Sequence, residues 1–408
     1  MTEKEFATKI FNAGGRAYLV GGAVRDKVRG VDAHDRDYCV TGLTENQLRE
    51  IFPNAQKFGK SFPVYSIDID GANCEVALAR TEKKVGSGYR GFKVDFNPSV
   101  TIEQDLFRRD TTINAMAIEI LSGELIDPFG GNDDVKNKKI RAVSKHFTDD
   151  PVRALRAARQ GAQFEFEIVD ETFHDMNLCA FELKNEAGER IFAELENALK
   201  TDRPSIFFRN LEQAGLLGVT FPEIDNLRGK IQPTKFHPEG DSYEHAMKIV
   251  DDVAAVNKNP VARFAALAHD FGKGTTPIEK LPHHYKHEVR GLDVLAEMDA
   301  RIHLPKDWRK IAAFVIKEHM RAPMLSSPGK IVDLLIRIHK MNFVKDFTDI
   351  INADHHGLPF YLADAEKILA EIMQITGKDV PPELSGKKIG EYIFQKRIRK
   401  FIEIYRQR

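Results

Sequence analysis

The chain has 408 residues, of which 42% are hydrophobic and 30% charged, a composition typical of a globular protein with roughly two to four domains. Its 60 Lys and Arg residues balance 61 Asp and Glu residues, and a net charge of −1 excludes a strongly basic nucleic-acid coat protein. The three cysteines form no CxxC pair, and no apolar run approaches the ~20 residues that a membrane span needs. We therefore expect reduced thiols, a cytoplasmic location and no membrane contact.

The first region that carries chemistry begins with an apolar run over residues 18–20, which predicts a short strand. Gly21 and Gly22 follow, and residues without a Cβ allow a tight turn and a close approach to a ligand. Residues 23–28 predict a helix with free N–H groups in its first turn, where Arg25 also lies. This arrangement is suited to binding a phosphate group.

Two carboxylates, Asp35 and Asp37, come shortly after this helix and ahead of the apolar pair Cys39-Val40. If this stretch is a strand, the alternation of side chains puts both carboxylates on one face. Such a pair beside a phosphate site can hold Mg²⁺ on a nucleoside triphosphate. Glu75, on another predicted strand, is a candidate third carboxylate, and an ion pair between Glu75 and Arg80 is an equally open interpretation.

This order of strand, Gly-Gly turn, helix and Asp-x-Asp resembles the polymerase-β-like nucleotidyltransferases of the class II tRNA nucleotidyltransferase and poly(A) polymerase family. The resemblance implies that Asp35 and Asp37 are the catalytic residues and bind Mg²⁺. It also implies that Gly22 and Arg25 bind the nucleotide. Residues 80–98 predict a basic loop, and the family uses a flexible loop at this position to change from adding C to adding A.

Residues 105–117 resemble a second motif of this family, with the sequence Asp-Leu-Phe-Arg-Arg-Asp-Thr-Thr-Ile-Asn-Ala-Met-Ala. The resemblance implies that Arg109 contacts the triphosphate or the ribose of the nucleotide. Asp110 and Asn114 are spaced one helical turn apart, so we expect them to lie together. The turn over residues 127–131 corresponds to the family's hinge between head and neck.

Residues 149–159 predict a helix that starts at Pro151 and is capped by Asp149 or Asp150. Its arginines recur every three residues and form one stripe, at Arg153, Arg156 and Arg159. Alanine and leucine fill the positions between them, so we expect the arginines to face a cleft. An exposed, arginine-rich helix is the alternative.

This stretch is similar to the family's Glu-Asp-x-x-Arg motif, with Asp149 in place of the usual Glu. The resemblance implies that Asp150 and Arg153 select the incoming base. A carboxylate that accepts from the base amine and a guanidinium that donates to the ring complement C and A and reject G and U. Arg156 and Arg159 would then bind phosphate or ribose, or hold Asp150 in place.

Histidines are concentrated later in the chain, where eleven of the 14 lie between residues 237 and 356. A His, a His-Asp pair and a distant Asp, all in helical sequence, resemble the metal ligands of HD-domain hydrolases, here His245, His269, Asp270 and Asp354. Such mixed imidazole and carboxylate ligands suit a transition metal such as Ni²⁺, which would polarise phosphate and activate water. Candidate outer or phosphate-side groups are His284, His287 and His319, and purely structural histidines are the alternative.

We predict an α+β fold with a polymerase-β-like head that contains a small mixed sheet, followed by helical regions. The predicted parts are a nucleotidyltransferase head at 1–138, an all-α neck and body with the nucleotide template at 139–227, an HD phosphohydrolase domain at 228–360 and a basic C-terminal helical tail at 361–408. This combination resembles the bacterial multifunctional CCA-adding enzymes.

The resemblance implies addition or repair of the 3′-terminal CCA of tRNA from CTP and ATP, without a nucleic-acid template. It also implies a metal-dependent phosphodiesterase, 2′-nucleotidase or phosphatase activity in the HD domain. The expected partners are tRNA, ATP and CTP, and the expected assembly is a monomer or homodimer. Open alternatives are an A-adding or CC-adding specialist, a poly(A) polymerase, and an RNA-binding HD phosphohydrolase with an inactive head.

Overall fold

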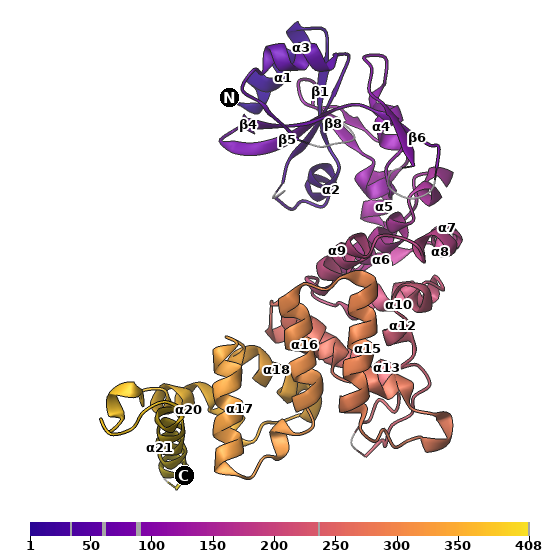
Figure 1. The fold of residues 1–408 in the computed structure, drawn as a ribbon. Helices are drawn as coiled ribbons and strands as arrows, with labels where there is room; N and C mark the ends of the chain where they lie inside the picture. Colours follow the sequence, from indigo (N-terminus) through magenta and orange to yellow (C-terminus); the bar gives the residue numbers. More distant parts are fainter. Residues whose placement is uncertain (33–34, 59–62, 87–90, 236, 407–408) are drawn as a thin grey trace. The chain divides into compact units, whose positions relative to one another are not determined.

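The computed structural model of the chain forms two compact units (Figure 1). The first contains residues 1–194 and 206–220, and the second contains residues 195–205 and 221–408. The residues that the structure describes are 1–32, 35–58, 63–86, 91–235 and 237–406. None of the helices in these ranges is both long enough and apolar enough to cross a membrane.

A seven-stranded mixed sheet lies at the centre of the first unit, with the strand order β3-β4-β5-β2-β1-β8-β9. Its strands are β1 (Arg16–Val20), β2 (Asp37–Thr41), β3 (Gln56–Phe58), β4 (Val64–Ile69), β5 (Ala72–Leu78), β8 (Ala117–Glu119) and β9 (Leu125–Ile126). β2 pairs antiparallel with β1 and parallel with β5, so it occupies the middle of the sheet. One face of the sheet buries Val20 and Cys39 against Leu106 of α4 (Ile102–Phe107).

Short helices accompany this sheet, and their ends follow local sequence signals. They are α1 (Glu3–Asn12), α2 (Gly22–Val28), α3 (Glu45–Ile51), α5 (Gly131–Lys136) and the 3₁₀ helix η1 (Thr112–Asn114). The Thr44 hydroxyl accepts from the backbone N–H of Gln47, and the Gln47 side chain accepts from the N–H of Thr44, which starts α3. The predicted strand over 18–20 and helix over 23–28 are confirmed as β1 and α2.

The prediction of a loop over residues 80–98 is wrong for two segments. β6 (Thr81–Lys84) pairs antiparallel with β7 (Phe92–Asp95), while residues 87–90 of the predicted loop lie outside the described residues. Phe92 and Val94 alternate with charged residues in β7, which is a short strand signal that the prediction missed. β6 contains no apolar residue, so nothing in its own sequence indicates the pairing. Contacts from distant residues stabilise it, such as the 2.6 Å ion pair between Lys84 and Glu182 of α8 (Ala180–Leu183).

Most of the rest of the first unit is helical. The helices are η2 (Lys145–Asp149), α6 (Val152–Phe164), α7 (Asp170–Leu178), α8, and α11 (Leu217–Thr220), with α9 (Gly188–Leu199) and α10 (Ser205–Gln213) extending into the second unit. The parallel strands β10 (Lys139–Ile140) and β11 (Glu167–Ile168) pair beside them. α6 buries Ala154, Ala157 and Ala158 completely, because small side chains allow close packing on that face.

The second unit is all-helical within its described residues. Its elements are α12 (Pro222–Asp225), α13 (Ser242–Val256), α14 (Pro260–Ala268), η3 (Phe271–Thr275), η4 (Ile278–Lys280), α15 (His287–Ile302), α16 (Lys306–Glu318), η5 (Ala322–Met324), α17 (Pro328–Lys340), α18 (Val344–His355), α19 (Phe360–Ala363), α20 (Ala365–Ile372), η6 (Gly377–Asp379) and α21 (Lys387–Arg406). One hydrophobic core joins α13, α14, α17, α18 and α20 with Phe401 of α21. The sheet and helices confirm the predicted α+β class, and the four predicted domain boundaries stay predictions.

Arg263 of α14 ties the second unit together from inside, since its side chain has 0% exposure. Its Nε donates to the carbonyl of Asn257 at 2.7 Å, and its Nη2 donates to that of Ala254 at 2.9 Å. Its Nη1 donates to the carbonyls of Leu199 at 2.6 Å and Thr201 at 2.7 Å. One guanidinium thus satisfies four buried backbone acceptors.

We expect Arg263→Leu to lower the free energy of unfolding by about 3–5 kcal/mol, because these carbonyls would lose their donors inside the protein. Chemical denaturation followed by circular dichroism measures the change. Arg309→Leu is the matched control, since Arg309 is 53% exposed and its ion pair with Asp299 should contribute less than ~1 kcal/mol. Equal stability of the two variants would contradict this role of Arg263.

Candidate functional site

A pocket of about 470 Å³ in the first unit adjoins the Gly21-Gly22 turn. Its described lining residues are Gly21, Gly22, Arg25, Asp37, Arg80, Glu82, Arg108, Arg109, Asp110, Asn114, Asp150, Arg153, Arg156 and Arg190. Seven of these are arginines and four are carboxylates. Such an excess of guanidinium groups around a few carboxylates is suited to a polyanion that carries a divalent cation.

Asp37 lies at the first position of β2, next to Glu75 of β5 in the parallel register. Asp35 and Asp37 are both exposed, but the structure corrects the predicted strand, because β2 begins at Asp37 and Asp35 precedes it. Although Asp37 reaches solvent, crowding by neighbouring protein atoms raises its pKa, and the Glu75 carboxylate raises it further. A cation bound at Asp37 would relieve this repulsion, so the donor set fits Mg²⁺.

The Gly-Gly turn has little room for side chains. Gly21 has φ +67°, and a Cβ there would lie 3.0 Å from Nη1 of Arg109. A Cβ on Gly22 would lie 3.3 Å from Nη2 of Arg25. Arg25 in turn donates from Nη1 to the Asn114 side-chain oxygen at 2.7 Å. The glycines therefore allow two guanidinium groups to approach the turn that leads into α2.

Asp105 holds two of the arginines in place. It is 1% exposed, and it accepts from Arg108 Nη2 at 2.7 Å and from Arg109 Nη2 at 3.0 Å. Burial opposes ionisation, but these guanidinium groups outweigh it and lower the pKa of Asp105 to about 2. Asp105 was missing from the predicted site, and only its neighbouring arginines in the motif could have indicated it.

Asp110 and Asn114 come together as predicted, with Asn114 Nδ2 donating to Asp110 Oδ1 at 3.4 Å. The second Asp110 oxygen accepts from Gln160 of α6 at 3.1 Å, and the Gln160 side-chain oxygen accepts from the Thr111 hydroxyl at 2.6 Å. Despite burial, the positive charge of Arg156 lowers the pKa of Asp110. These bonds connect the motif at residues 105–117 with α6.

Asp150 is held by an arginine that the sequence did not indicate. Arg190 Nη2 donates to both Asp150 oxygens, at 2.9 and 2.8 Å, and Arg190 also pairs with Glu186 at 2.9 Å. Asp150 Oδ1 accepts from the backbone N–H of Val152 at 3.2 Å, so it caps α6 as well. A lone arginine forty residues along the chain has no local pattern, which explains why it was missed.

The three arginines of α6 have different surroundings. Arg153 is 6% exposed, donates to the His146 carbonyl at 2.5 Å and lies 3.8 Å from Glu82. Arg156 lines the pocket and contacts Glu194 at 3.4 Å. Arg159 is not among the lining residues described for the pocket, and it donates to Glu194 at 2.7 Å. Arg153 and Arg156 therefore line the pocket, as predicted for a cleft. Asp150 is held by Arg190, and not by Arg156 or Arg159 as the alternative prediction had it.

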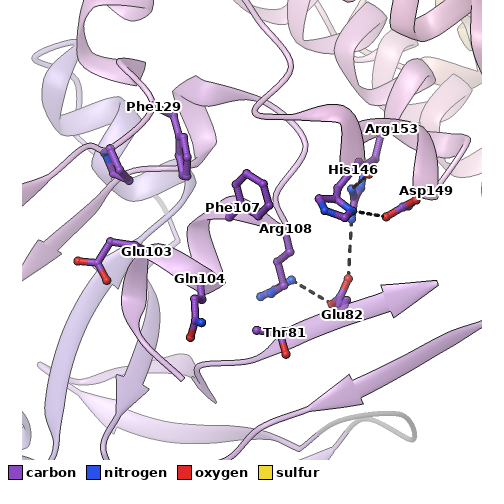
Figure 2. Close-up of a pocket in the computed structure, with 11 residues that line it drawn as sticks. Thr81, Glu82, Glu103, Gln104, Phe107, Arg108, Phe129, His146, Asp149 and Arg153 are labelled. Carbon is purple, nitrogen blue, oxygen red and sulfur yellow. Dashed lines mark hydrogen bonds and ion pairs between the residues drawn. The ribbon is translucent and has the colours of Figure 1, made fainter. Parts of the chain in front are cut away.

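A second pocket of about 450 Å³ shares Glu82, Arg108 and Arg153 with the first (Figure 2). In Figure 2, the Phe107 ring stands between Phe129 and His146, and the ring centroids are 5.8 and 5.3 Å apart. Glu82 lies between Arg108 and Arg153, and it lines both pockets.

A separate cluster of histidines and carboxylates lies in the second unit. The four predicted metal ligands come together from the helices α13 and α18 and the end of α14: His245, His269, Asp270 and Asp354. His245 Nε2 lies 3.2 Å from Asp354 Oδ1 and 3.8 Å from Asp270 Oδ2. His269 Nε2 lies 3.1 Å from Asp270 Oδ2 and 3.7 Å from Asp354 Oδ1. All four residues are buried.

The chemistry of this donor set fits a divalent cation. His269 Nδ1 donates to the Ala266 carbonyl at 2.6 Å, which leaves Nε2 as the atom that faces the carboxylates. Burial disfavours a charged imidazole, but Asp270 and Asp354 outweigh it and raise the pKa of His269 to about 9. Within the described residues, His269 Nε2 and both Asp270 oxygens form no hydrogen bond of good geometry. A cation here would balance the two buried carboxylates and compete with the proton on His269.

Two further histidines reach the same cluster. His287 Nε2 and His319 Nε2 lie 3.2 and 3.5 Å from Asp270 Oδ1. His287 comes close because η3 packs tightly on α15, where a Cβ on Gly272 would lie 2.0 Å from the His287 carbonyl. His284 does not join them, since its ring nitrogens contact the Thr276 hydroxyl and the Ile231 carbonyl.

Three family models match successive regions of the chain. The family model described as Poly A polymerase head domain matches residues 17–141. The model described as Probable RNA and SrmB- binding site of polymerase A matches 165–228, and the HD domain model matches 242–341.

The chain also resembles solved structures in its fold. The Bacillus stearothermophilus CCA-adding enzyme in complex with CTP is 21% identical, with a TM-score of 0.67 and coverage of 99% of this chain and 96% of that one. The Thermotoga maritima CCA-adding enzyme complexed with tRNA is 22% identical, with a TM-score of 0.60 and coverage of 98% and 92%.

Curated relatives are more similar in sequence. The multifunctional CCA protein of Nitrosococcus oceani is 43% identical over 79% of this chain and 79% of its own length. That of Thioalkalivibrio sulfidiphilus is 38% identical over 94% of this chain and 97% of its own length. With this identity over most of its length, the chain belongs to the family of multifunctional CCA proteins.

Proposed function

We propose that the first unit transfers CMP and AMP from CTP and ATP to the 3′ end of tRNA and thereby builds or repairs the CCA sequence. The observation that carries this proposal is that Asp37 and the Asp150–Arg190 pair line the same arginine-rich pocket. The relatives' names and the solved neighbours with CTP and tRNA support the same substrates.

In this proposal Asp35 and Asp37 hold Mg²⁺, which would stabilise charge on the α-phosphate and on the leaving pyrophosphate. Arg25 and Arg109 bind the phosphate oxygens beside the Gly22 backbone, and Asp105 fixes Arg109 for this task. The 3′ hydroxyl of tRNA attacks the α-phosphate from the open side of the pocket, in line with the departing pyrophosphate.

Asp150 and Arg153 select the base in this proposal. Arg190 donates to both Asp150 oxygens, so the carboxylate is held in one orientation in which it can accept from the amine of C or A. Arg153 is held by the His146 carbonyl and lies near Glu82, so its guanidinium has a fixed direction. G and U would present a carbonyl oxygen to the carboxylate, and the repulsion excludes them. Arg156 and Arg159 are proposed to bind the phosphate or the ribose of the nucleotide. Arg159 would first have to release its hydrogen bond to Glu194.

Incorporation of labelled CTP and ATP tests this function on three tRNA transcripts, which lack the whole CCA sequence, lack only its last two nucleotides, or lack only its final A. We expect CMP as the first nucleotide added to the first two transcripts and AMP on the third, with no UMP or GMP on any. Addition of only A, or only CC, would indicate a specialist. Long A tails on an unstructured RNA would indicate a poly(A) polymerase.

We expect Arg190→Met to lower the preference for CTP over UTP by roughly 5- to 100-fold, because Asp150 would lose its bidentate partner. Steady-state kinetics with each nucleotide on the same primer measure the ratio of kcat/KM values. Arg16→Met, an exposed site on β1, is the control and should leave the ratio unchanged. A purely structural role of Arg190 would reduce both rates equally and preserve the ratio.

We further propose that the second unit is a metal-dependent phosphohydrolase. The observation that carries this proposal is the convergence of His245, His269, Asp270 and Asp354 in a buried cluster. A transition metal such as Ni²⁺ suits these ligands and would polarise phosphate and activate water. Lys273 lies 2.5 Å from Asp270 and supplies a positive charge for the phosphate group of a 2′,3′-cyclic nucleotide or a 2′-nucleotide.

A further inference from the structure

We infer that Phe164, the last residue of α6, is a positioning residue for nucleotidyl transfer, because its ring holds the Arg25 guanidinium in place for the triphosphate of the incoming nucleotide. The base-selecting residues Asp150 and Arg153 lie at the other end of α6, so one helix positions the groups for both ends of the nucleotide. The inference rests on the proposed transfer of CMP and AMP. Phe164 lies outside the predicted site and is not among the lining residues described for the pocket.

The Phe164 ring covers one face of the Arg25 guanidinium. The central guanidinium carbon of Arg25 lies 4.3 Å from the ring centroid, and that of Arg29 lies 4.8 Å from it. An aromatic ring attracts a cation through the negative charge on its face, yet it carries no net charge. A second carboxylate at this position would neutralise Arg25. The ring instead holds Arg25 and leaves its positive charge available to an anion.

The edge of the same guanidinium is hydrogen-bonded on two sides. Arg25 Nε and Nη2 donate to the two Asp26 oxygens at 3.1 and 3.0 Å, and Nη1 donates to the Asn114 side-chain oxygen at 2.7 Å. A further N–H remains on Nη1 and another on Nη2. Nη2 lies beside the Gly-Gly turn, where a Cβ on Gly22 would be 3.3 Å away. The bonds fix Arg25 in its plane and the ring covers its face, with donors left for phosphate oxygens beside the turn.

A second contact connects Arg25 to the same face of α6. Gln160 precedes Phe164 by four positions, so the two side chains lie on one face of the helix. Gln160 Nε2 donates to Asp110 Oδ2 at 3.1 Å, and Asn114 Nδ2 donates to Asp110 Oδ1 at 3.4 Å. Asn114 is the residue that accepts from Arg25. α6 therefore reaches Arg25 twice, directly through Phe164 and through Gln160 with its two partners.

The chain after Phe164 keeps the ring in its position. Glu165 has a left-handed conformation with φ 52°, so the chain turns sharply at the end of α6. Phe166 then enters the core with 7% exposure, and its ring centroid lies 5.7 Å from that of Phe164. The backbone N–H of Phe166 donates to the Gly161 carbonyl at 3.2 Å. A ring anchored in this way can restrict the movement of a long arginine side chain.

A double-mutant cycle on nucleotide binding tests the inference. Equilibrium dialysis of the full chain with labelled CTP and Mg²⁺, without tRNA, measures the dissociation constant while no transfer takes place. We expect Phe164→Leu to weaken CTP binding by about 3- to 30-fold, because the attraction between ring and guanidinium is lost. In the Arg25→Met background the same substitution should change binding by less than about 2-fold. Phe164→Tyr keeps the ring and should bind CTP as the unsubstituted protein does.

Steady-state kinetics provide a readout that a general loosening of α6 would change differently. Phe164→Leu should raise KM for CTP and for ATP by similar factors and leave the preference for CTP over UTP unchanged, since Asp150 and Arg153 stay in place. Phe181→Leu is the matched control, because Phe181 is 82% exposed on α8, and it should leave both quantities unchanged.

Equal weakening of CTP binding by Phe164→Leu with and without Arg25 would overturn the inference. A lower preference for CTP over UTP would also overturn it, because Phe164 would then act on the whole of α6. Failure of the unsubstituted protein to bind CTP would instead overturn the proposed transfer, and the inference with it. If Phe164→Leu does not fold by circular dichroism, Phe164→Met replaces it in the cycle with the same expected result.

Discussion

Asp37→Asn should reduce nucleotide addition by at least about 10³-fold, since a lost metal ligand removes several kcal/mol of transition-state stabilisation. Asn keeps the size of the side chain and one oxygen but loses the charge that holds the cation. Asp35→Asn should have a similar effect, because Asp35 is proposed to hold the same ion. Initial rates of labelled CMP incorporation in Mg²⁺ measure the loss.

Binding of tRNA should survive these substitutions, because the arginines of the pocket remain in place. Asp68→Asn is the matched control, since its carboxylate is 61% exposed on strand β4 of the same sheet. Wild-type turnover of Asp37→Asn would show that the cation is held elsewhere.

His269→Ala is expected to remove the hydrolase activity, because His269 Nε2 faces both carboxylates of the cluster. Removal of one ligand typically lowers metal affinity strongly, and the buried Asp270 would lose a neighbour that balances its charge. Hydrolysis of 2′,3′-cyclic nucleotides and 2′-nucleotides with Ni²⁺, Mn²⁺ or Mg²⁺ measures the effect. His339→Ala, exposed on α17, should keep full activity. Equal activity of the two variants would mean that the predicted ligands are structural.

Local patterns allowed much of the first site to be predicted. The strand over 18–20, the Gly-Gly turn and α2 follow one another without a long gap, and their geometry depends on nearby residues. The same holds for α6, because Pro151, the Asp150 cap and the buried alanines specify its start and its packing face.

The residues that were missed depend on contacts between distant parts of the chain. Arg190 reaches Asp150 across forty positions, and nothing around Arg190 distinguishes it from a solvated helix residue. β6 contains no apolar residue, yet it pairs with β7. Tertiary contacts decide both cases, so propensity and motif spacing carry no signal for Arg190 or for β6.

Histidine content indicated the second site but not its full membership. His284 and His287 are three positions apart, yet only His287 faces Asp270. The difference arises because η3 packs on α15 at Gly272, a contact between separate elements. The sequence alone therefore made His284 and His287 equal candidates, although only His287 lies in the cluster.

We propose that one chain carries two chemically independent sites, and a crossed assay tests their independence most directly. Both activities are measured on Asp37→Asn and on His269→Ala, each against the unsubstituted protein. We predict that Asp37→Asn hydrolyses cyclic nucleotides at the unsubstituted rate and adds no nucleotide, while His269→Ala adds CCA normally and hydrolyses nothing. Loss of both activities in either variant would contradict the account.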